Sequence, residues 1–440
     1  MNGRVLAFTA FVSIAAGLVF GAVPALHVSR TDLQRTLQAE SNAVSGGRAA
    51  LRLQRMFVGI EVALAIALLA GAGLLVSSFL NLGRVQPGFD PSNVLTMRLT
   101  LAWERYQPER IEPFFQELRE RVSAIPGVTA VATTSQYPPS VFGRNQFEIE
   151  GAPAQADAAV PVAYTTLISP GYFDAMGMTV VRGRGVTEAD QQSSPWVAVI
   201  DETAARRYFP DIDPIGQRVR VDPDAPWMEI VGVTAATQNT GLDREPQPEL
   251  FGSTLQLRGF SNQMFLVIRT SIAPRSVLPA VRAAVGAIDP EQPVYMIRTL
   301  EETLAQTQAT RRLSMYSLGV LALFALLLAA VGIYGVVAYA VSRRTREIGV
   351  RMALGAARSQ VLGMVIRQAL LPVAIGAAIG ISAAVAIGRL MSSLLFGVSG
   401  GDPVTLLAAA TLLGTAALLA SWLPARRVVA LDPVQALRPK

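Results

Sequence analysis

Pairs of acidic residues are the groups in this 440-residue chain that could do acid–base chemistry. Two carboxylates that face a common space could act as general acid and general base in a hydrolysis. Neighbouring acidic residues lie more often in solvated turns and at helix starts than in catalytic sites. We therefore expect no enzymatic activity and no catalytic residue. The pairs are Asp201 with Glu202, Asp222 with Asp224, and Glu301 with Glu302.

The scarcity of other reactive side chains excludes several classes of site. The chain has no cysteine, so a disulfide framework is excluded. Its one histidine, His27, lies at the end of an apolar run that is long enough to be embedded in a membrane, where we expect neither a zinc cluster nor a Ser-His-Asp triad. Its one lysine is Lys440, and a P-loop needs a lysine after a glycine-rich turn. Gly183 and Gly185 alternate with arginines, but a turn explains them better than a phosphate nest. We expect no metal, no cofactor and no ATPase site in the chain itself.

Composition indicates a membrane protein. Hydrophobic residues make up 51% of the chain and charged residues 16%. Residues 82–312 hold 21 Arg against 26 Asp plus Glu, whereas the rest of the chain has 17 basic and 6 acidic residues. The basic excess therefore lies in the segments that flank apolar runs, where cytoplasmic retention and contact with membrane lipids explain it. No basic patch interleaved with aromatic residues indicates binding to nucleic acid.

The apolar runs predict a multi-pass protein of the plasma (inner) membrane with five helices. All basic segments then fall on one side, which places the N-terminus outside the cytoplasm and the C-terminus inside it. The predicted transmembrane helices are residues 5–28, 56–80, 314–341, 369–395 and 404–423. Between them lie a cytoplasmic linker (29–55), an extracytoplasmic domain (82–312), a cytoplasmic segment (343–368) and a cytoplasmic tail (424–440).

The first predicted helix, residues 5–28, has two interpretations. A cleaved signal peptide is one, because Arg4 precedes the run and small residues end it. The other starts from a repeat: residues 24–28, with Asp32 and Leu37, match residues 424–428, with Asp432 and Leu437, at an offset of 400. We favour the second interpretation, in which this helix is the remnant of a preceding copy of the unit that ends the chain.

The extracytoplasmic domain shows two β-α-β patterns with a middle portion between them. Residues 94–101, 128–134 and 147–150 resemble strands, with a helical pattern at 109–125. Near the other end, strands are expected at 263–269 and 294–297, with a helix at 276–288. We predict a split α+β lobe with a second lobe inserted between about residues 164 and 251. The helix at 301–312 should continue directly into the next membrane helix.

Two charged features lie in or beside the membrane. Glu61, about one turn into the second helix, is expected to reach the cytoplasmic interface or to pair with an arginine, rather than to mark an ion pathway. Residues 343–368 combine six arginines with apolar residues that can form one side of a helix. Such an amphipathic segment lies on the membrane surface or continues a membrane helix out of the bilayer.

Several motifs resemble those of MacB/FtsX-type permeases of ABC transporters. The segment between the expected second and third helices of one permease unit carries the resemblance best, with Arg346, Glu347, Ile348, Gly349, Val350, Arg351, Met352, Ala353, Leu354, Gly355 and Ala356. Further matching segments in the same order are residues 169–173, 182–184, 199–202, 205–210, 213–216, 424–427 and 432–438. The family often has Asn where this chain has Asp201. The resemblance covers about residues 50 to 440.

This resemblance implies a permease subunit with a MacB-like periplasmic core of two lobes, driven by a separate ABC ATPase. The ATPase-coupling role falls on Arg346, Glu347, Ile348, Gly349, Arg351, Leu354, Gly355 and Ala356. The resemblance also implies a second permease copy, as a dimer or a fused repeat, and allows a periplasmic adaptor. Export or extraction of a substrate at the outer face is the expected function. The alternative is an FtsX-like signalling permease that regulates an extracytoplasmic partner, such as a cell-wall hydrolase, without transport.

Overall fold

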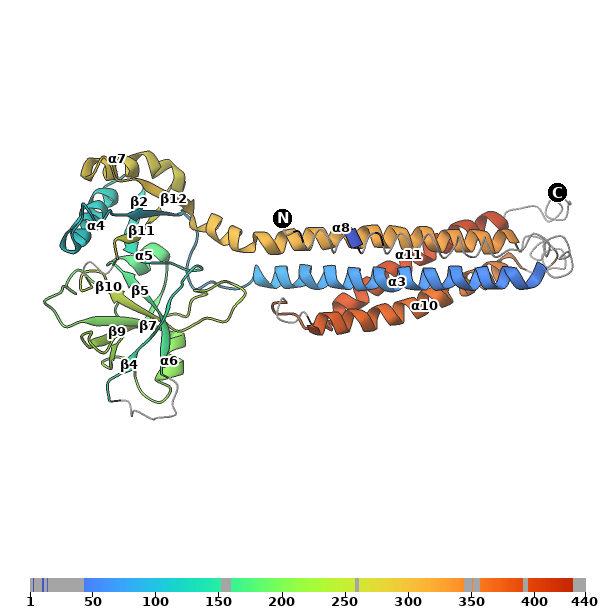
Figure 1. Cartoon of the computed structure of the whole chain (residues 1–440), viewed down its shortest axis with the longest axis horizontal. Helices are drawn as coiled ribbons and strands as arrows, with labels where there is room; N and C mark the ends of the chain where they lie inside the picture. Colours follow the sequence, from blue (N-terminus) through green and yellow to red (C-terminus); the bar gives the residue numbers. More distant parts are fainter. Residues whose placement is uncertain are drawn as a thin grey trace. The chain divides into compact units, whose positions relative to one another are not determined.

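Two compact units make up the part of the chain that a computed structural model describes. The described residues are 3, 10, 11, 14, 43–151, 160–257, 261–343, 350, 357–390 and 395–429. One unit, here the α/β unit, contains the described residues of Leu74–Leu318 and Met391–Ser399. The other, here the helical unit, contains those of Met1–Gly73, Gly319–Leu390 and Gly400–Lys440. Figure 1 shows the elements of both.

The first lobe of the α/β unit is built from the two predicted β-α-β patterns. Its strands lie in the order β12-β1-β11-β2, and each adjacent pair is antiparallel. Helices α4 and α7 cover one face, where buried Leu95 and Leu99 pack with Phe115 and Val281. The elements are β1 (Val94–Thr100), α4 (Pro108–Ser123), β2 (Val128–Thr134), β11 (Gln263–Thr270), η1 (Pro274–Val277), α7 (Leu278–Ile288) and β12 (Val294–Thr299).

The second lobe continues the same sheet. A single residue pair, Thr134 with Ile168, joins β2 to β5, so the twelve strands form one sheet across both lobes. The two strands at the junction, β5 and β10, run parallel to each other and contain the predicted boundaries at 164 and 251. The elements are β3 (Arg144–Gln146), β4 (Glu148–Ile149), β5 (Val162–Ile168), α5 (Tyr172–Met176), β6 (Val180–Gly183), β7 (Val197–Asp201), α6 (Glu202–Tyr208), β8 (Arg218–Arg220), β9 (Met228–Thr234) and β10 (Glu249–Ser253).

The glycine in the Arg-Gly-Arg motif has a packing role in this lobe. Gly183 has φ +68°, and a Cβ atom there would lie 2.1 Å from the Val231 carbonyl oxygen. Glycine is therefore required for the close approach of β6 to β9. This packing requirement explains why glycine stands at position 183, and no phosphate-binding role is needed to explain it.

Four helices of the described residues are long and apolar enough to cross a membrane. They are α3 (Ala43–Leu82), α8 (Leu300–Arg343), α10 (Arg358–Leu390) and α11 (Pro403–Val429). The predicted helix at 5–28 lies outside the described residues apart from isolated positions. The expected linker at 29–55 is helical from Ala43 onward, because the Ala-, Leu- and Arg-rich sequence before residue 56 favours continuation of α3. The second part of segment 343–368 likewise belongs to α10, which begins at Arg358.

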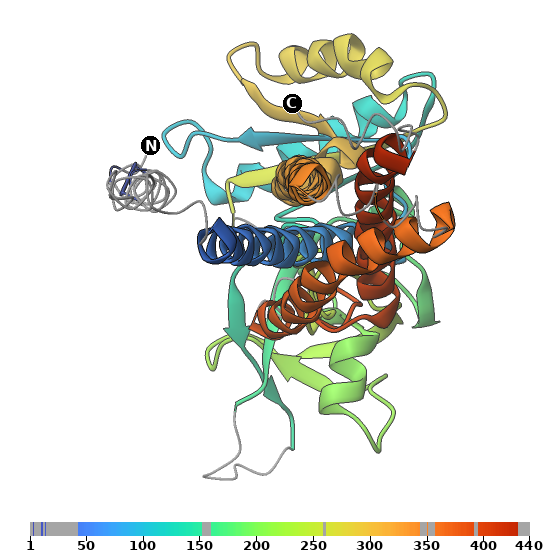
Figure 2. The same ribbon diagram turned by 90° about the vertical axis from the view of Figure 1, so that its right-hand side faces the viewer.

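Small residues bring α3 and α10 together within the helical unit. A Cβ atom on Gly376 would lie 2.4 Å from the Gly59 carbonyl oxygen, and one on Gly380 would lie 2.7 Å from that of Ala63. The two helices lie side by side in both views (Figures 1 and 2). Val62 of α3 and Ile333 of α8 belong to one buried cluster. Glycine thus permits close backbone contact in the bundle.

Candidate functional site along the membrane helices

Helix α8 begins with a capping box. Thr299 Oγ1 accepts a hydrogen bond from the Glu302 amide at 3.1 Å, and Glu302 Oε2 accepts one from the Thr299 amide at 3.1 Å. Such a reciprocal pair satisfies two amides that a helix start otherwise leaves free. Arg275 donates to the same carboxylate at 2.8 Å, and this hydrogen bond lowers the pKa of Glu302. Of the predicted acidic pair Glu301–Glu302, the second residue therefore has a structural role.

The other two acidic pairs also make local backbone contacts. Asp201 Oδ1 caps α6 by accepting a hydrogen bond from the Ala204 amide at 2.8 Å. Asp222 Oδ1 accepts one from the Asp224 amide at 2.9 Å, which closes a turn. These backbone contacts explain why acidic residues stand at positions 201 and 222, and a catalytic role is not needed to explain them.

A buried carboxyl group that the sequence patterns missed lies beside Asp201. Glu249, in β10, is fully buried, and burial, with a smaller contribution from the charge of Asp201, raises its pKa to about 7. Its Oε2 accepts a hydrogen bond from Asn239 Nδ2 at 3.0 Å. The only sequence signal is an acidic residue at the start of a short apolar run, which many solvated strand ends also show.

Contacts of two arginines connect α8 to other parts of the α/β unit. Arg311 Nη2 lies 2.6 Å from Asp243 Oδ2, and the Arg312 guanidinium stacks over the Phe79 ring at 5.3 Å. Phe79 is in the last turn of α3. The part of α8 just before its apolar stretch is therefore attached both to an external loop and to the end of α3.

The predicted ATPase-coupling residues lie outside the described residues. These are Arg346, Glu347, Ile348, Gly349, Arg351, Leu354, Gly355 and Ala356. The structure describes what flanks them: α8 ends at Arg343, and α10 begins at Arg358. Val350, inside the segment, is helical and 43% exposed. Residues 344–357, here the coupling segment, thus connect the end of α8 to the start of α10.

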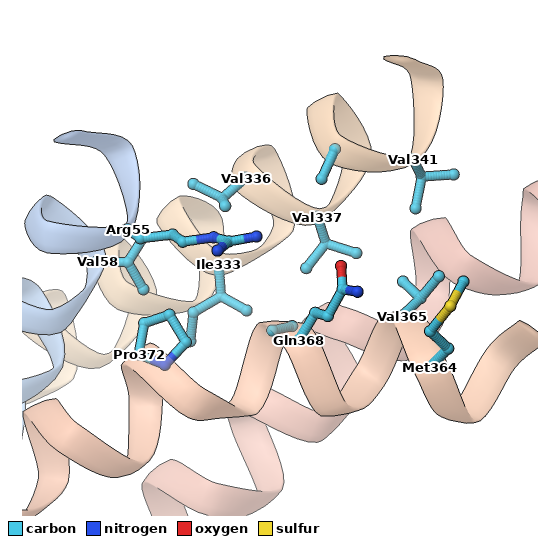
Figure 3. Close-up of a pocket in the computed structure, with 12 residues that line it drawn as sticks. Arg55, Val58, Ile333, Val336, Val337, Val341, Met364, Val365, Gln368 and Pro372 are labelled. Atoms are coloured by element: carbon cyan, nitrogen blue, oxygen red, sulfur yellow. The ribbon is translucent and has the colours of Figure 1, made fainter. Parts of the chain in front are cut away.

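A small cavity lies between α3, α8 and α10 near these flanks. Its volume is about 40 Å³, and its lining includes Arg55, Val337, Met364, Gln368 and Pro372. Figure 3 shows Arg55 extending from α3 and Gln368 from α10 toward the same space. The rest of the lining is mostly aliphatic, so the helices are incompletely packed beside the coupling segment.

Glu61 faces the interior of the bundle rather than an arginine of the described residues. Its Oε2 is buried without a hydrogen-bond partner in the described part of the chain. The same atom would lie 2.2 Å from a Cβ on Gly332 of α8. The absence of a side chain at Gly332 therefore makes room for this carboxylate.

The chain matches two models of known protein families. Residues 61–288, more than half of the chain, match the MacB-like periplasmic core domain. Residues 319–433 match the FtsX-like permease C-terminal domain, which includes the predicted coupling residues. The chain belongs to the family of MacB/FtsX-type ABC permeases. The predicted family and the fold class, a multi-span helical membrane protein with a large α+β extracytoplasmic domain, are confirmed.

Individual relatives cover part of the chain. It is 28% identical over 286 residues to the macrolide export ATP-binding/permease protein MacB of Salmonella choleraesuis, over 61% of this chain and 42% of that protein. The protein of the same name from Marinobacter nauticus is 31% identical over 276 residues, 59% of this chain and 40% of that one. The chain therefore spans less than half the length of these relatives.

A solved structure of a relative's periplasmic region also matches. It is the crystal structure of the periplasmic region of MacB from Actinobacillus actinomycetemcomitans, with 16% identity and a TM-score of 0.35. The match covers 50% of this chain and 94% of that one.

Proposed function

We propose that this chain is the permease subunit of an ABC transporter, in which a separate ATPase drives export or extraction of a substrate at the extracytoplasmic face. Helix α8 carries the proposal. It is one unbroken helix of 44 residues from the capping box at Thr299 to Arg343, after which the coupling segment begins. At 1.5 Å per residue it is about 65 Å long. A displacement of its cytoplasmic end is therefore passed along a continuous hydrogen-bonded helix.

The direction of coupling follows from the charges at the helix ends. Segment 343–368 is rich in arginine, which favours the cytoplasmic side and places the C-terminal tail there too. The α/β unit then lies outside, and if the predicted helix at 5–28 also crosses the membrane, the N-terminus lies on the same side as that unit. The ATPase docks on Arg346 to Ala356, membrane lipids surround the helices, and a second permease copy and a periplasmic adaptor complete the assembly. The chain supplies no catalytic residue of its own.

Affinity purification tests the coupling. The full chain, extracted from membranes of its host, should co-purify with an ABC ATPase and stimulate its ATP hydrolysis. Reversing charge in the coupling segment with Glu347→Lys or Arg351→Glu should weaken both effects. Glu120→Lys and Arg121→Glu, which make the same charge changes on α4, are the matched controls and should leave both unchanged.

Three results would contradict this proposal or redirect it. If no ATPase co-purifies, or if the coupling variants behave like their controls, the ATPase does not dock at this segment. If the ATPase binds but no substrate moves, while a specific extracytoplasmic protein binds the α/β unit, the signalling alternative is correct.

A further inference from the structure

A pocket of about 480 Å³ lies in the first lobe of the α/β unit, where that lobe meets the first turns of α8. Its lining includes Arg98, Gln136, Phe142, Phe265, Arg298 and Gln306. A volume of this size fits a small organic molecule. The pocket involves none of the residues predicted to couple to the ATPase.

Strand alternation explains why polar side chains gather on this side of the sheet. Leu95, Met97 and Leu99 of β1 point into the core under α4 and α7. Thr96 and Arg98 therefore point to the opposite face. Phe265 of β11 is the partner of Arg98 in the sheet register, and Arg298 of β12 is the partner of Thr96. Three adjacent strands thus place two arginines on one face.

The charge of the pocket is entirely positive among its described lining residues, which include no Asp or Glu. Arg98 forms no ion pair with any described residue, and its Nε is buried without a hydrogen-bond partner among them. Arg298 Nη1 donates a hydrogen bond to Gln306 Oε1. The nearby Glu302 carboxylate is already held by Arg275. Two guanidinium groups in one pocket without a carboxylate favour an anionic ligand.

Apolar groups complete the pocket beside these arginines. Tyr137 and Phe265 pack edge to face with ring centroids 5.0 Å apart. Phe142 is 66% exposed and Met296 is 45% exposed, although both are large apolar residues. Met296 also has φ +49°, a conformation that residues with a side chain seldom adopt. The pocket therefore offers exposed apolar surface next to the two cations.

We propose that this pocket binds a small amphiphilic anion, with an aromatic or acyl body and one carboxylate or phosphate group. The oxyanion pairs with Arg98 and Arg298, and the body packs on Phe142 and Phe265. Thr303, Gln306 and Thr307 of α8 also line the pocket, so the ligand touches the helix that continues into the membrane. This assignment deepens the proposed permease function by naming a ligand class. Binding of the anion does not require the permease function; only the interpretation of the ligand as relevant to transport rests on it.

Calorimetric titration of the full chain, in nanodiscs of zwitterionic lipid and without an ATPase, tests the assignment. The probes are 2-naphthoate, 2-naphthyl phosphate, the neutral 2-naphthamide and the cationic 2-naphthylmethylammonium. Both anions should bind at least tenfold more tightly than the amide, since charge-assisted hydrogen bonds are stronger than neutral ones. The cation should not bind. Raising the salt concentration should weaken binding of the anions but not of the amide.

Variants then locate the bound anion. Arg98→Gln and Arg298→Gln should each weaken 2-naphthoate binding about tenfold, and Arg98→Lys should restore part of the loss. Arg121→Gln, on α4 over the opposite face of the sheet, removes the same charge and should have no effect. If Arg98→Gln fails to fold, Arg298→Gln and the probe series on the unsubstituted chain still test whether the pocket binds the anion.

Equal affinity for naphthoate and naphthamide would overturn the assignment. The absence of saturable anion binding would also overturn it. So would a loss of 2-naphthoate affinity in Arg121→Gln that equals the loss in Arg98→Gln and Arg298→Gln. Because no ATPase is present, a negative result here leaves the ATPase coupling intact. A negative pull-down likewise leaves this site intact.

Discussion

The backbone amide of Glu249 donates a hydrogen bond to Oδ1 of Asp201 at 2.9 Å. This hydrogen bond joins β10 to the end of β7 beside the junction of the two lobes. The carboxyl groups of Asp201 and Glu249 are both buried. The Glu249 carboxylate accepts hydrogen bonds from Thr166 at 2.5 Å and Asn239 at 3.0 Å. Two acidic groups thus share one buried site, and burial raises the pKa of each.

This arrangement predicts that the α/β unit loses stability as the pH rises from about 4.5 to about 7. Burial raises the Glu249 pKa from 4.5 in an unfolded chain to about 7 in the folded protein. In that window the folded state holds a proton that the unfolded state has released, so the free energy of unfolding decreases as pH rises. At 1.36 kcal/mol per pH unit the loss is about 3 kcal/mol. Thermal unfolding of the purified chain between pH 4 and 8, followed by tryptophan fluorescence, measures it.

Glu249→Gln is the matched variant for this prediction, because glutamine keeps the shape and does not titrate. In this variant, most of the decrease in the free energy of unfolding between pH 4.5 and 7 should disappear. A smaller slope of the same sign should remain from Asp201, whose pKa is also raised by burial. An unchanged slope in Glu249→Gln would show that other groups cause the pH dependence.

The glycine contacts between α3 and α10 predict opposite effects for two alanine substitutions on one helix. Gly376→Ala places a methyl group against the Gly59 carbonyl oxygen, which cannot move without shifting α3, and should lower stability by about 1–3 kcal/mol. Gly363→Ala meets no atom within 4 Å. It should be neutral or stabilising by up to about 1 kcal/mol, since alanine favours helix. Thermal unfolding of both variants in one detergent compares them, and equal melting temperatures would contradict this packing.

The capping box at Thr299 predicts local fraying when it is removed. Thr299→Ala takes away the hydroxyl that accepts from the Glu302 amide, at a cost of about 0.5–2 kcal/mol. Hydrogen exchange should accelerate at the amides of Glu301, Glu302 and Thr303 and stay unchanged in the apolar part of α8. Thr307→Ala, which alters a hydroxyl inside the same helix, is the control. Equal exchange in both variants would show that the cap does not set the helix start.

Periodicity was enough to predict much of the α/β unit. Strand β2 has the predicted bounds, and β1, β11, α4 and α7 lie within a few residues of theirs. The sharing of one sheet by both lobes was not predictable, because it depends on the pairing of Thr134 with Ile168. Glu249 was missed for a similar reason. Its hydrogen-bond partners Thr166 and Asp201 are 83 and 48 residues away in the sequence, so no local pattern reveals the buried site.

Helix ends beyond the membrane were the less predictable part of the helical unit. Hydropathy detects the apolar stretch of α3 but not its extension back to Ala43, since polar helix formers carry no hydropathy signal. Glu61 illustrates the same limit. Only the packing of α3 on α8 shows that its carboxylate lies over Gly332. The residues predicted to couple to the ATPase stay a prediction from motif resemblance.

A proline in α8 should separate ATPase binding from the response of the α/β unit. Gly335 lies on the exposed side of α8, and a Cβ atom added there would meet no other atom within 4 Å. Gly335→Ala should therefore leave both ATPase binding and the response of the α/β unit unchanged. Gly335→Pro removes one backbone hydrogen bond and clashes with the preceding turn, at about 3 kcal/mol or more, which kinks the helix.

Because the coupling segment itself is unaltered, the Gly335→Pro variant should still retain the ATPase in a pull-down. Its α/β unit should no longer respond to nucleotide. Hydrogen exchange at Thr303, Gln306 and Thr307, measured with and without ATP, reports that response. A response equal to that of Gly335→Ala would mean that motion reaches the α/β unit by another route, such as α3. Loss of ATPase binding would instead mean that the kink disturbs the coupling segment, and the separation would fail.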